Sequence, residues 1–257
     1  MNPKLGLIAL SEQSEPLPPP ALSSGDQTRS VALFLDFDGT LVEIADQPDA
    51  IDVATRLPDA LLKLKERMSD RLAIVSGRSI EDLRRYLGAS FDVAMAGSHG
   101  AARQLANGDP LGDQPNALPG SVVEKLREFA KDNGLRYETK THGGALHYRE
   151  NPDAEKAAHQ FAKAVARENG LALKTGKCVV ELVHKGADKG SAVRAFMQIA
   201  PFKDAVPVFV GDDVTDEDGF AAVEELGGYG VLVGEQRETA ARYRLASVAQ
   251  VHQWLGL

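Results

Sequence analysis

Apolar runs alternate with amphipathic stretches along most of the chain. Near-continuous apolar runs predict buried strands over residues 31–37, 71–77, 91–97, 206–212 and 229–234. Helical spacing of the apolar positions predicts helices over residues 58–68, 79–87, 189–198 and 216–226. Apolar strands that alternate with helices are typical of a parallel sheet covered by helices on both faces. The pattern therefore predicts an α/β fold built on a parallel, Rossmann-like sheet.

The pattern changes in the middle of the chain. A predicted helix over 121–134 leads into two strands of alternating polarity, and the same plan then repeats from a helix over 152–170. Gly134 and Gly170 stand at equivalent helix ends, where glycine is a common cap. We expect an inserted α+β cap domain over 109–183, between the two parts of a core domain, 31–108 and 184–257. Residues 1–30 are rich in proline and serine and predict a flexible arm.

Composition narrows the class of partner. The chain has 29 Lys and Arg against 37 Asp and Glu, and this net charge of -8 argues against nucleic acid or an anionic membrane. No apolar run is long enough to span a membrane, and the single cysteine, Cys178, cannot form an internal disulfide. We expect a cytoplasmic protein that acts as a monomer on a small molecule.

Polar residues follow the predicted strands at their carboxyl ends, where an open parallel sheet binds its ligands. Asp36 and Asp38 close the first strand, and residues 76–78, 97–100 and 212–218 close three others. Lys189 opens the helix that precedes the last of these strands. Because Asp36 and Asp38 are two residues apart at one strand end, their like charges repel. Either a cation lies between them or one of them keeps a proton, or both.

These side chains suit a phosphate ester. At about 4 Å and an effective dielectric of about 20, an attacking carboxylate meets a repulsion of roughly 8 kcal/mol from a phosphate dianion. Mg²⁺ between the two, with Lys189 opposite, reverses the sign of this interaction, and Ser76 with backbone N–H groups holds the remaining oxygens. The residues therefore predict phosphoryl transfer through an aspartyl phosphate.

Each feature taken alone has another interpretation. An aspartate pair after a strand can cap the next turn, and a lysine at a helix start is commonly solvated. Asp216, Asp218, Gly219 and Glu225 also fit four positions of a calcium-binding loop. Val214, however, occupies the first position of that loop, and a predicted strand precedes it where a helix is required. The order of the four strand-end elements together favours phosphoryl transfer.

That order resembles the haloacid dehalogenase superfamily of aspartyl phosphotransferases. Its four motifs correspond to FLDFDGTL, VSGR, Lys189 in ADKG, and GDDVTDED, and the insertion corresponds to a type C2 cap. Within the superfamily, the chain is similar to the trehalose-6-phosphate phosphatases. This similarity rests on GSHG, the pair Glu138 and Lys140, HYR, VEL, KG and GDDVTDEDGF, in this order. It extends from Val31 to Leu255.

The resemblance implies roles for the core residues. Asp36 would be the nucleophile and a metal ligand, and Asp38 would be the general acid and base, with its backbone carbonyl on Mg²⁺. Asp212 and Asp216 would complete the metal site. Ser76 and Lys189 would bind the phosphoryl group.

The resemblance also implies substrate-binding residues. Arg78 and His99 would lie near the pocket rim, and Lys140, His147 and Glu181 of the cap would hydrogen-bond the sugar hydroxyls. The implied activity is Mg²⁺-dependent hydrolysis of trehalose 6-phosphate, a phosphoric monoester hydrolase reaction of trehalose biosynthesis. Two alternatives remain open: a phosphatase for another glycosyl phosphate, such as a sucrose or mannosylglycerate phosphate, and a regulatory domain without turnover. The presence of Asp36 argues against the regulatory domain.

Overall fold

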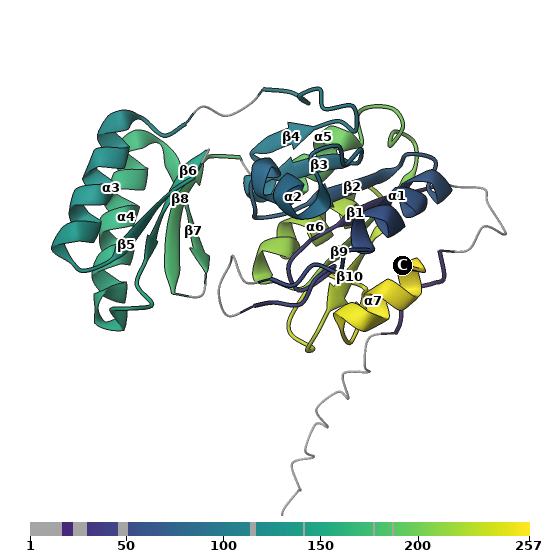
Figure 1. The fold of residues 1–257 in the computed structure, drawn as a ribbon. Coiled ribbons are helices and arrows are strands. Elements are labelled where there is room, and N and C mark those ends of the chain that lie inside the picture. Colours follow the sequence, from purple (N-terminus) through teal and green to yellow (C-terminus); the bar gives the residue numbers. More distant parts are fainter. Residues whose placement is uncertain are drawn as a thin grey trace, which may run out of the picture.

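The chain folds into two units that lie side by side, a larger core and a smaller cap (Figure 1). The computed structural model describes residues 17–22, 30–45, 51–113, 117–140, 142–176, 178–186 and 188–257. A seven-stranded sheet, parallel except for one edge strand, forms the core, and a four-stranded antiparallel sheet forms the cap. The predicted α/β class with a mostly parallel core sheet is confirmed.

The core sheet has the strand order β11-β10-β9-β1-β2-β3-β4. Its strands are β1 (Val31–Leu35), β2 (Leu72–Val75), β3 (Ala94–Gly97), β4 (Ala102–Gln104), β9 (Val206–Gly211), β10 (Tyr229–Val233) and β11 (Tyr243–Leu245). Central β1 is parallel to both neighbours, and its Phe34 pairs with Ala73 of β2 and Phe209 of β9. The carboxyl ends of β1, β2, β3 and β9 therefore meet at one edge of the sheet.

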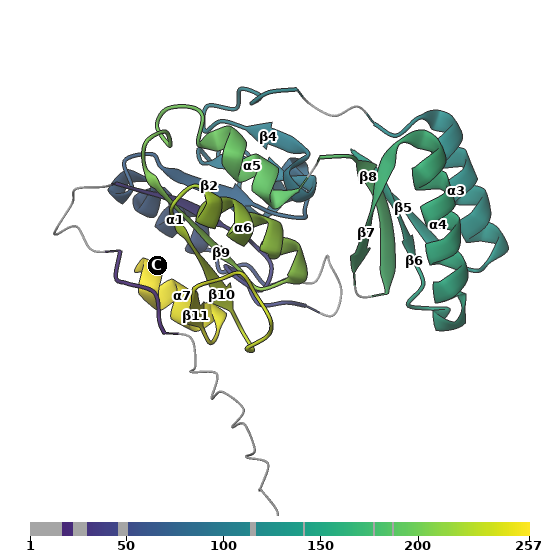
Figure 2. The ribbon, with the colours of Figure 1, turned by 180° about the vertical axis from the view of Figure 1, so that it is seen from behind.

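Helices cover both faces of the core sheet (Figure 2). They are α1 (Leu57–Arg67), α2 (Ile80–Leu87), α5 (Lys189–Phe196), α6 (Glu217–Glu225) and α7 (Val248–Leu255). Successive side chains of a strand point to opposite faces. Leu33 and Leu35 of β1 consequently pack with α1, α2 and α7, while Ala32 and Phe34 pack with α5 and α6. The central strands of the core sheet are thus buried on both faces, which explains the near-continuous apolar runs in the sequence.

The cap sheet has helices on one face only. Its strands β5 (Arg136–Lys140), β6 (Gly143–His147), β7 (Leu171–Gly176) and β8 (Val179–His184) take the order β5-β6-β8-β7. Helices α3 (Gly120–Asp132) and α4 (Glu155–Asn169) pack on Leu146, Val180 and Leu182 of the sheet. The opposite, polar face of the sheet is turned toward the core (Figure 1).

The chain passes between the units at two places. Leu111 still packs on the core, and Leu118 is the first described residue of the cap's apolar cluster. The first crossing therefore lies a few residues after the predicted boundary at 109, because the antiparallel hairpin of β4 continues through Pro110. The second crossing leads from β8 into Lys189, the first residue of α5.

Part of the predicted N-terminal arm lies on the core. Trp254 Nε1 donates a hydrogen bond to the carbonyl of Pro20 at 2.9 Å, and Leu22 packs against the cluster beneath α7. The loose arm expected over residues 1–30 is therefore wrong for 17–22, since this proline-rich stretch offers carbonyl acceptors and an apolar side chain to α7. Residues 1–16 and 23–29 lie outside the described residues. Within the described part of the chain, every helix is too short or too polar to cross a membrane.

Candidate active site

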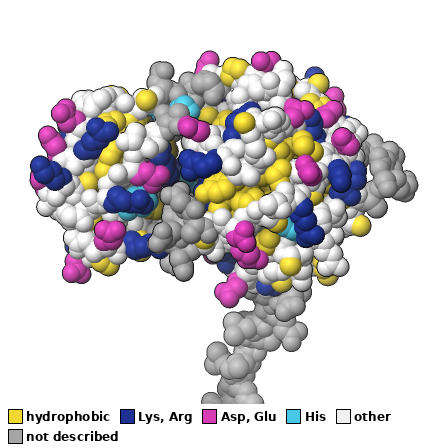
Figure 3. Space-filling view, viewed as in Figure 1, with side chains coloured by type: hydrophobic (Ala, Val, Ile, Leu, Met, Phe, Trp, Pro, Cys, Tyr) yellow, Lys and Arg dark blue, Asp and Glu magenta, His cyan; other side chains and the backbone are white. Residues whose placement is uncertain are grey.

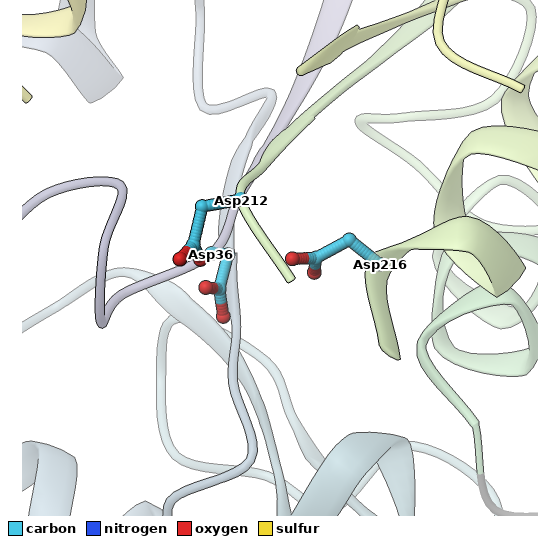
Figure 4. Close-up of side chains that lie close together, drawn as sticks. All are labelled: Asp36, Asp212 and Asp216. Carbon is cyan, nitrogen blue, oxygen red and sulfur yellow. The ribbon is translucent and has the colours of Figure 1, made fainter. Parts of the chain in front are cut away.

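Three carboxylates converge at the carboxyl edge of the core sheet (Figure 4). Asp36 follows β1, Asp212 follows β9, and Asp216 ends the short 3-10 helix η4 (Val214–Asp216) that leads into α6. One carboxylate oxygen of each residue lies within 4.8 Å of the others. These three positions are the strand-end aspartates that the sequence places together.

Lys189 lies among these carboxylates at the start of α5. Its Nζ donates to Asp36 Oδ1 at 2.7 Å and to Asp216 Oδ1 at 2.6 Å. The three side chains are almost completely buried, with exposed fractions of 3% for Lys189, 5% for Asp36 and 0% for Asp216. One cation, Lys189, thus lies among three carboxylates, of which Asp36 and Asp216 are buried and Asp212 is partly exposed.

This excess of negative charge is reflected in the pKa values. Burial raises the pKa of Asp36 well above the ordinary carboxyl value and also raises the pKa of Asp216, and the attraction of Lys189 offsets these rises only in part. Burial and the neighbouring Asp216 raise the pKa of Asp212 to about 7. A hard divalent cation would relieve the repulsion, and carboxylate oxygens are its preferred ligands. The donor set therefore fits such a cation.

Glycines make room for this cluster. Gly39 has a φ of +74°, and a Cβ built there would lie 2.1 Å from Asp212 Oδ2. A Cβ at Gly211 would lie 2.3 Å from Asp216 Cγ. Substitution at either position would displace a carboxylate of the site, which explains why glycine interrupts both acidic motifs.

Asp38 lies apart from the carboxylate cluster and has its own cation. Arg78 Nε donates to Asp38 Oδ2 and Arg78 Nη2 donates to Asp38 Oδ1, both at 2.7 Å, which forms a bidentate pair. The guanidinium also lies over the ring of Tyr86, 5.1 Å from its centroid. The repulsion expected between Asp36 and Asp38 is thus met by two separate cations, Lys189 and Arg78.

Two buried hydroxyl groups, those of Thr40 and Ser76, follow the neighbouring strands β1 and β2 in the chain. Ser76 follows β2, is 0% exposed, and accepts a hydrogen bond from the backbone N–H of Arg78 at 3.1 Å. Thr40 is also 0% exposed, and its Oγ1 has no hydrogen-bond partner within the described structure. Sequence analysis did not single out Thr40, although its position two residues after Asp38 was a usable signal. A buried hydroxyl without a partner suits a bound ligand oxygen.

His99 follows β3 in the short 3-10 helix η2 (Ser98–Gly100) and has a left-handed conformation, with φ 56° and ψ 32°. Its ring fits against Gly77, where a Cβ would lie 2.7 Å from Cε1. Burial, followed by the charges of Lys174, Lys189 and Lys140, lowers the pKa of His99 to about 2. The imidazole is therefore neutral at physiological pH and offers a buried Nδ1 that has no partner among the described residues.

The polar face of the cap carries two hydrogen-bonded pairs of polar side chains. Lys140 Nζ donates to Glu181 Oε2 at 2.8 Å, and His147 Nε2 lies 2.6 Å from Glu138 Oε2. The hydrogen bond from His147 lowers the pKa of Glu138. Glu138 was absent from the predicted set of site residues, and its signal was the spacing of two from Lys140, which places both on one face of β5.

The structure brings the predicted core residues together, whereas the predicted cap residues lie in the other unit (Figure 1). Asp36, Asp212, Asp216 and Lys189 form one cluster, and Asp38 with Arg78 lies beside it. Charged side chains of both signs gather along the junction of the two units (Figure 3).

Comparison with known proteins adds a family to this geometry. A family model described as trehalose-phosphatase matches residues 34–249. The trehalose-6-phosphate phosphatase of Escherichia coli (strain K12) is 39% identical over 239 residues, which cover 92% of this chain and 89% of that protein.

Solved structures point the same way. The crystal structure of a trehalose-6-phosphate phosphatase related protein has a TM-score of 0.72 at 30% identity, and the match covers 88% of this chain and 96% of that one. A phosphatase of the haloalkanoate (HAD) enzyme superfamily from Bacteroides thetaiotaomicron shares the fold, with a TM-score of 0.64 at 18% identity over 91% of this chain and 98% of that one. By the extent of these matches, the chain belongs to the trehalose-phosphatase family.

Proposed function

We propose that this chain hydrolyses trehalose 6-phosphate to trehalose and phosphate, through a phosphoryl group carried on Asp36. The observation that carries the proposal is the buried cluster of Asp36, Asp212 and Asp216 around Lys189 in a member of the trehalose-phosphatase family. A carboxylate that is buried beside a lysine at a strand end is fixed in position and can attack an electrophile.

The first step forms a bond between a carboxylate oxygen of Asp36 and the phosphorus, and breaks the bond between the phosphorus and the sugar oxygen. Lys189 holds Asp36 Oδ1 at 2.7 Å, which leaves Oδ2 for the attack. Lys189 also offers positive charge to the phosphoryl oxygens, and the hydroxyl groups of Ser76 and Thr40 can donate to them.

Asp38 supplies and removes the proton. It gives a proton to the departing sugar oxygen, and later takes one from the water that attacks the phosphorus and releases Asp36. Arg78 holds both carboxylate oxygens of Asp38 at 2.7 Å, so this pair must loosen whenever Asp38 carries a proton. We infer that Arg78 positions the carboxyl group of Asp38 for these proton transfers.

Asp36, Asp212 and Asp216, with the backbone carbonyl of Asp38, would hold Mg²⁺. This ion supplies positive charge against the phosphate dianion when it is bound. The fit rests on the oxygen donors and on the raised pKa of Asp212, which show a negative charge that Lys189 does not balance.

The cap would recognise the sugar. Lys140, Glu181, His147 and Glu138 present hydrogen-bond donors and acceptors on the face turned toward the core, and such groups match sugar hydroxyls. His99 would add a neutral ring nitrogen at the edge of the phosphoryl site. We further propose that cap and core move as separate units, that the protein is a cytoplasmic monomer, and that nucleic acid and membranes are not its partners. The net charge of -8 supports the last point.

Phosphate release from a panel of sugar phosphates tests the proposal. With Mg²⁺ we expect trehalose 6-phosphate to be turned over far faster than sucrose 6-phosphate or glucose 6-phosphate, and EDTA to stop the reaction. Asp36→Asn is the matched control, because it keeps the shape of the side chain and removes the nucleophile. A preference for another glycosyl phosphate would overturn the substrate assignment. Full turnover in EDTA would overturn the mechanism.

A further inference from the structure

Lys174 of β7 lies on the polar face of the cap but was not among the expected site residues. It pairs across the sheet with Glu181 of β8, and Glu181 in turn pairs with Ala145 of β6. Side chains in one such row share a face of the sheet. Lys174 therefore belongs to the face that is turned toward the core, together with Glu181.

Lys174 is a partly buried cation without a close partner. It forms no salt bridge or hydrogen bond with any described residue. Burial lowers its pKa, and the attraction of Asp218, Asp188 and Glu181, in this order, offsets the effect only in part. The charges that act on Lys174 therefore include two core carboxylates as well as Glu181, its neighbour in the same sheet. Both ribbon views agree with this, since β7 is the cap strand that lies beside α6 (Figures 1 and 2).

The two core carboxylates differ in their availability. Asp188 caps α5, and its Oδ1 accepts a hydrogen bond from Ser191 N at 2.6 Å. Asp218 lies in the first turn of α6, is exposed, and has no ion pair with a described residue. Among the described residues, a cap cation without an ion pair and a core carboxylate without an ion pair therefore lie on neighbouring elements, β7 and α6.

Asp218 is also fixed relative to the phosphoryl site. A Cβ at Gly190 would lie 2.3 Å from the carbonyl oxygen of Asp218, so α5 and α6 meet closely at this point. Gly190 directly follows Lys189, whose Nζ binds Asp36 and Asp216. A bond from the cap to Asp218 would consequently align the cap with the frame that holds Lys189.

We propose that Lys174 is a positioning residue that pairs with Asp218 when the cap closes over the ends of the core strands. Only the expected effect of this ion pair on catalysis rests on the proposed function. The effect of the pair on cap closure can be measured without turnover. It would hold the sugar-binding face of the cap in register with Asp36. Lys140 and Glu181, which already bind each other at 2.8 Å, remain available to the sugar.

The first test measures the distance between cap and core in the free protein. Spin labels on cysteines introduced at exposed Glu128 of α3 and Lys63 of α1, with Cys178→Ser, report this distance by pulsed electron paramagnetic resonance. We expect Lys174→Glu to shift the distribution to longer distances, and the reversed pair Lys174→Glu with Asp218→Lys to restore it. Lys163→Glu on the outer helix α4 is the control and should change nothing. A reversed pair that stays open would overturn the proposal.

The second test separates positioning from direct substrate contact. Lys174→Met should raise KM for trehalose 6-phosphate about two- to five-fold, as expected for an exposed ion pair, and leave a small aryl phosphate unaffected. The reversed pair should recover this loss. An equal loss on both substrates, or a loss that the reversed pair does not recover, would show that Lys174 touches the phosphoryl group instead. A wild-type protein that does not turn over trehalose 6-phosphate would refute the proposed function and leave the distance measurement to decide the role of Lys174.

Discussion

Lys189 offers a direct test of the electrostatics of the buried cluster. Lys189→Met keeps an unbranched side chain of similar length and removes the charge that binds Asp36 at 2.7 Å and Asp216 at 2.6 Å. Breaking a buried ion pair by removing one partner costs about 3 to 5 kcal/mol. For a chain of this size each kcal/mol lowers Tm by roughly 2–4 °C, so we expect a fall of roughly 6–20 °C in metal-free buffer at about pH 8.

The loss of stability in Lys189→Met should increase as pH rises. The pKa values of Asp36 and Asp216 are already raised by burial, and removal of Lys189 raises them further. Between the ordinary carboxyl pKa of about 4 and the raised value, the folded protein binds more protons than the unfolded chain. The free energy of unfolding therefore falls as pH rises through this range. Near pH 5, where the carboxylates keep protons, the variant should lie much closer to the wild type.

Thermal melting followed by circular dichroism, in EDTA at about pH 5 and about pH 8, measures the fall of Tm caused by Lys189→Met at each pH. Lys63→Met, at an exposed position of α1, is the matched control and should leave Tm unchanged at both pH values. An equal loss of Tm at the two pH values would refute the reasoning, because it would mean that packing and not charge determines the cost.

Three further variants test other parts of the site. Asp38→Asn keeps its shape but cannot transfer a proton, so it should slow hydrolysis of the sugar phosphate by ~10²- to 10⁴-fold. With an aryl phosphate, whose leaving group needs no proton, it should give a burst of about one product per enzyme; stopped-flow absorbance without a burst would contradict this. Glu181→Ala should lower kcat/KM for trehalose 6-phosphate by one to two orders of magnitude, or about 1.5–3 kcal/mol, and spare the aryl phosphate. Exposed Glu150→Ala is its control, and equal losses on both substrates would make Glu181 structural. Asp212→Asn removes a carboxyl whose pKa is raised to about 7, so in EDTA the fall of Tm between about pH 4 and pH 7 should become shallower than in the wild type. An unchanged pH slope would argue against the raised pKa of Asp212.

The core and its acidic cluster were predictable because they follow from strand ends. A buried parallel strand leaves a strong apolar run, and the rule that ligands bind at the carboxyl ends then selects the residues after each run. Asp36, Asp212 and Lys189 come together for this reason, although they are far apart in the chain. Charge suggested the phosphate-binding role of Lys189, and the family resemblance supplied the separate roles of Asp36 and Asp212.

Features that depend on pairing between strands were harder to predict. Strands β4 and β11 have three residues each, too few to show a period, and helix α7 was missed with them. The position of Lys174 on the core-facing side of the cap could not be predicted from the sequence. It depends on the register that places Lys174 opposite Glu181 and on the side of the cap on which β7 lies. The separate cation for Asp38 was missed too, because Arg78 reaches it from the end of another strand.

The insertion of the cap also determines the order in which the protein can fold during synthesis. The cap has its own apolar cluster from one continuous stretch of chain, whereas β1 of the core needs β9, which is made only after the cap. Leu33 of β1 pairs with Val208 of β9, so a pairing at the centre of the core spans most of the sequence. We expect the cap to fold first on the ribosome. Until β9 has been synthesised, the edge of β1 that pairs with β9 stays unpaired. The first part of the core is therefore the segment of the growing chain that most needs protection from aggregation.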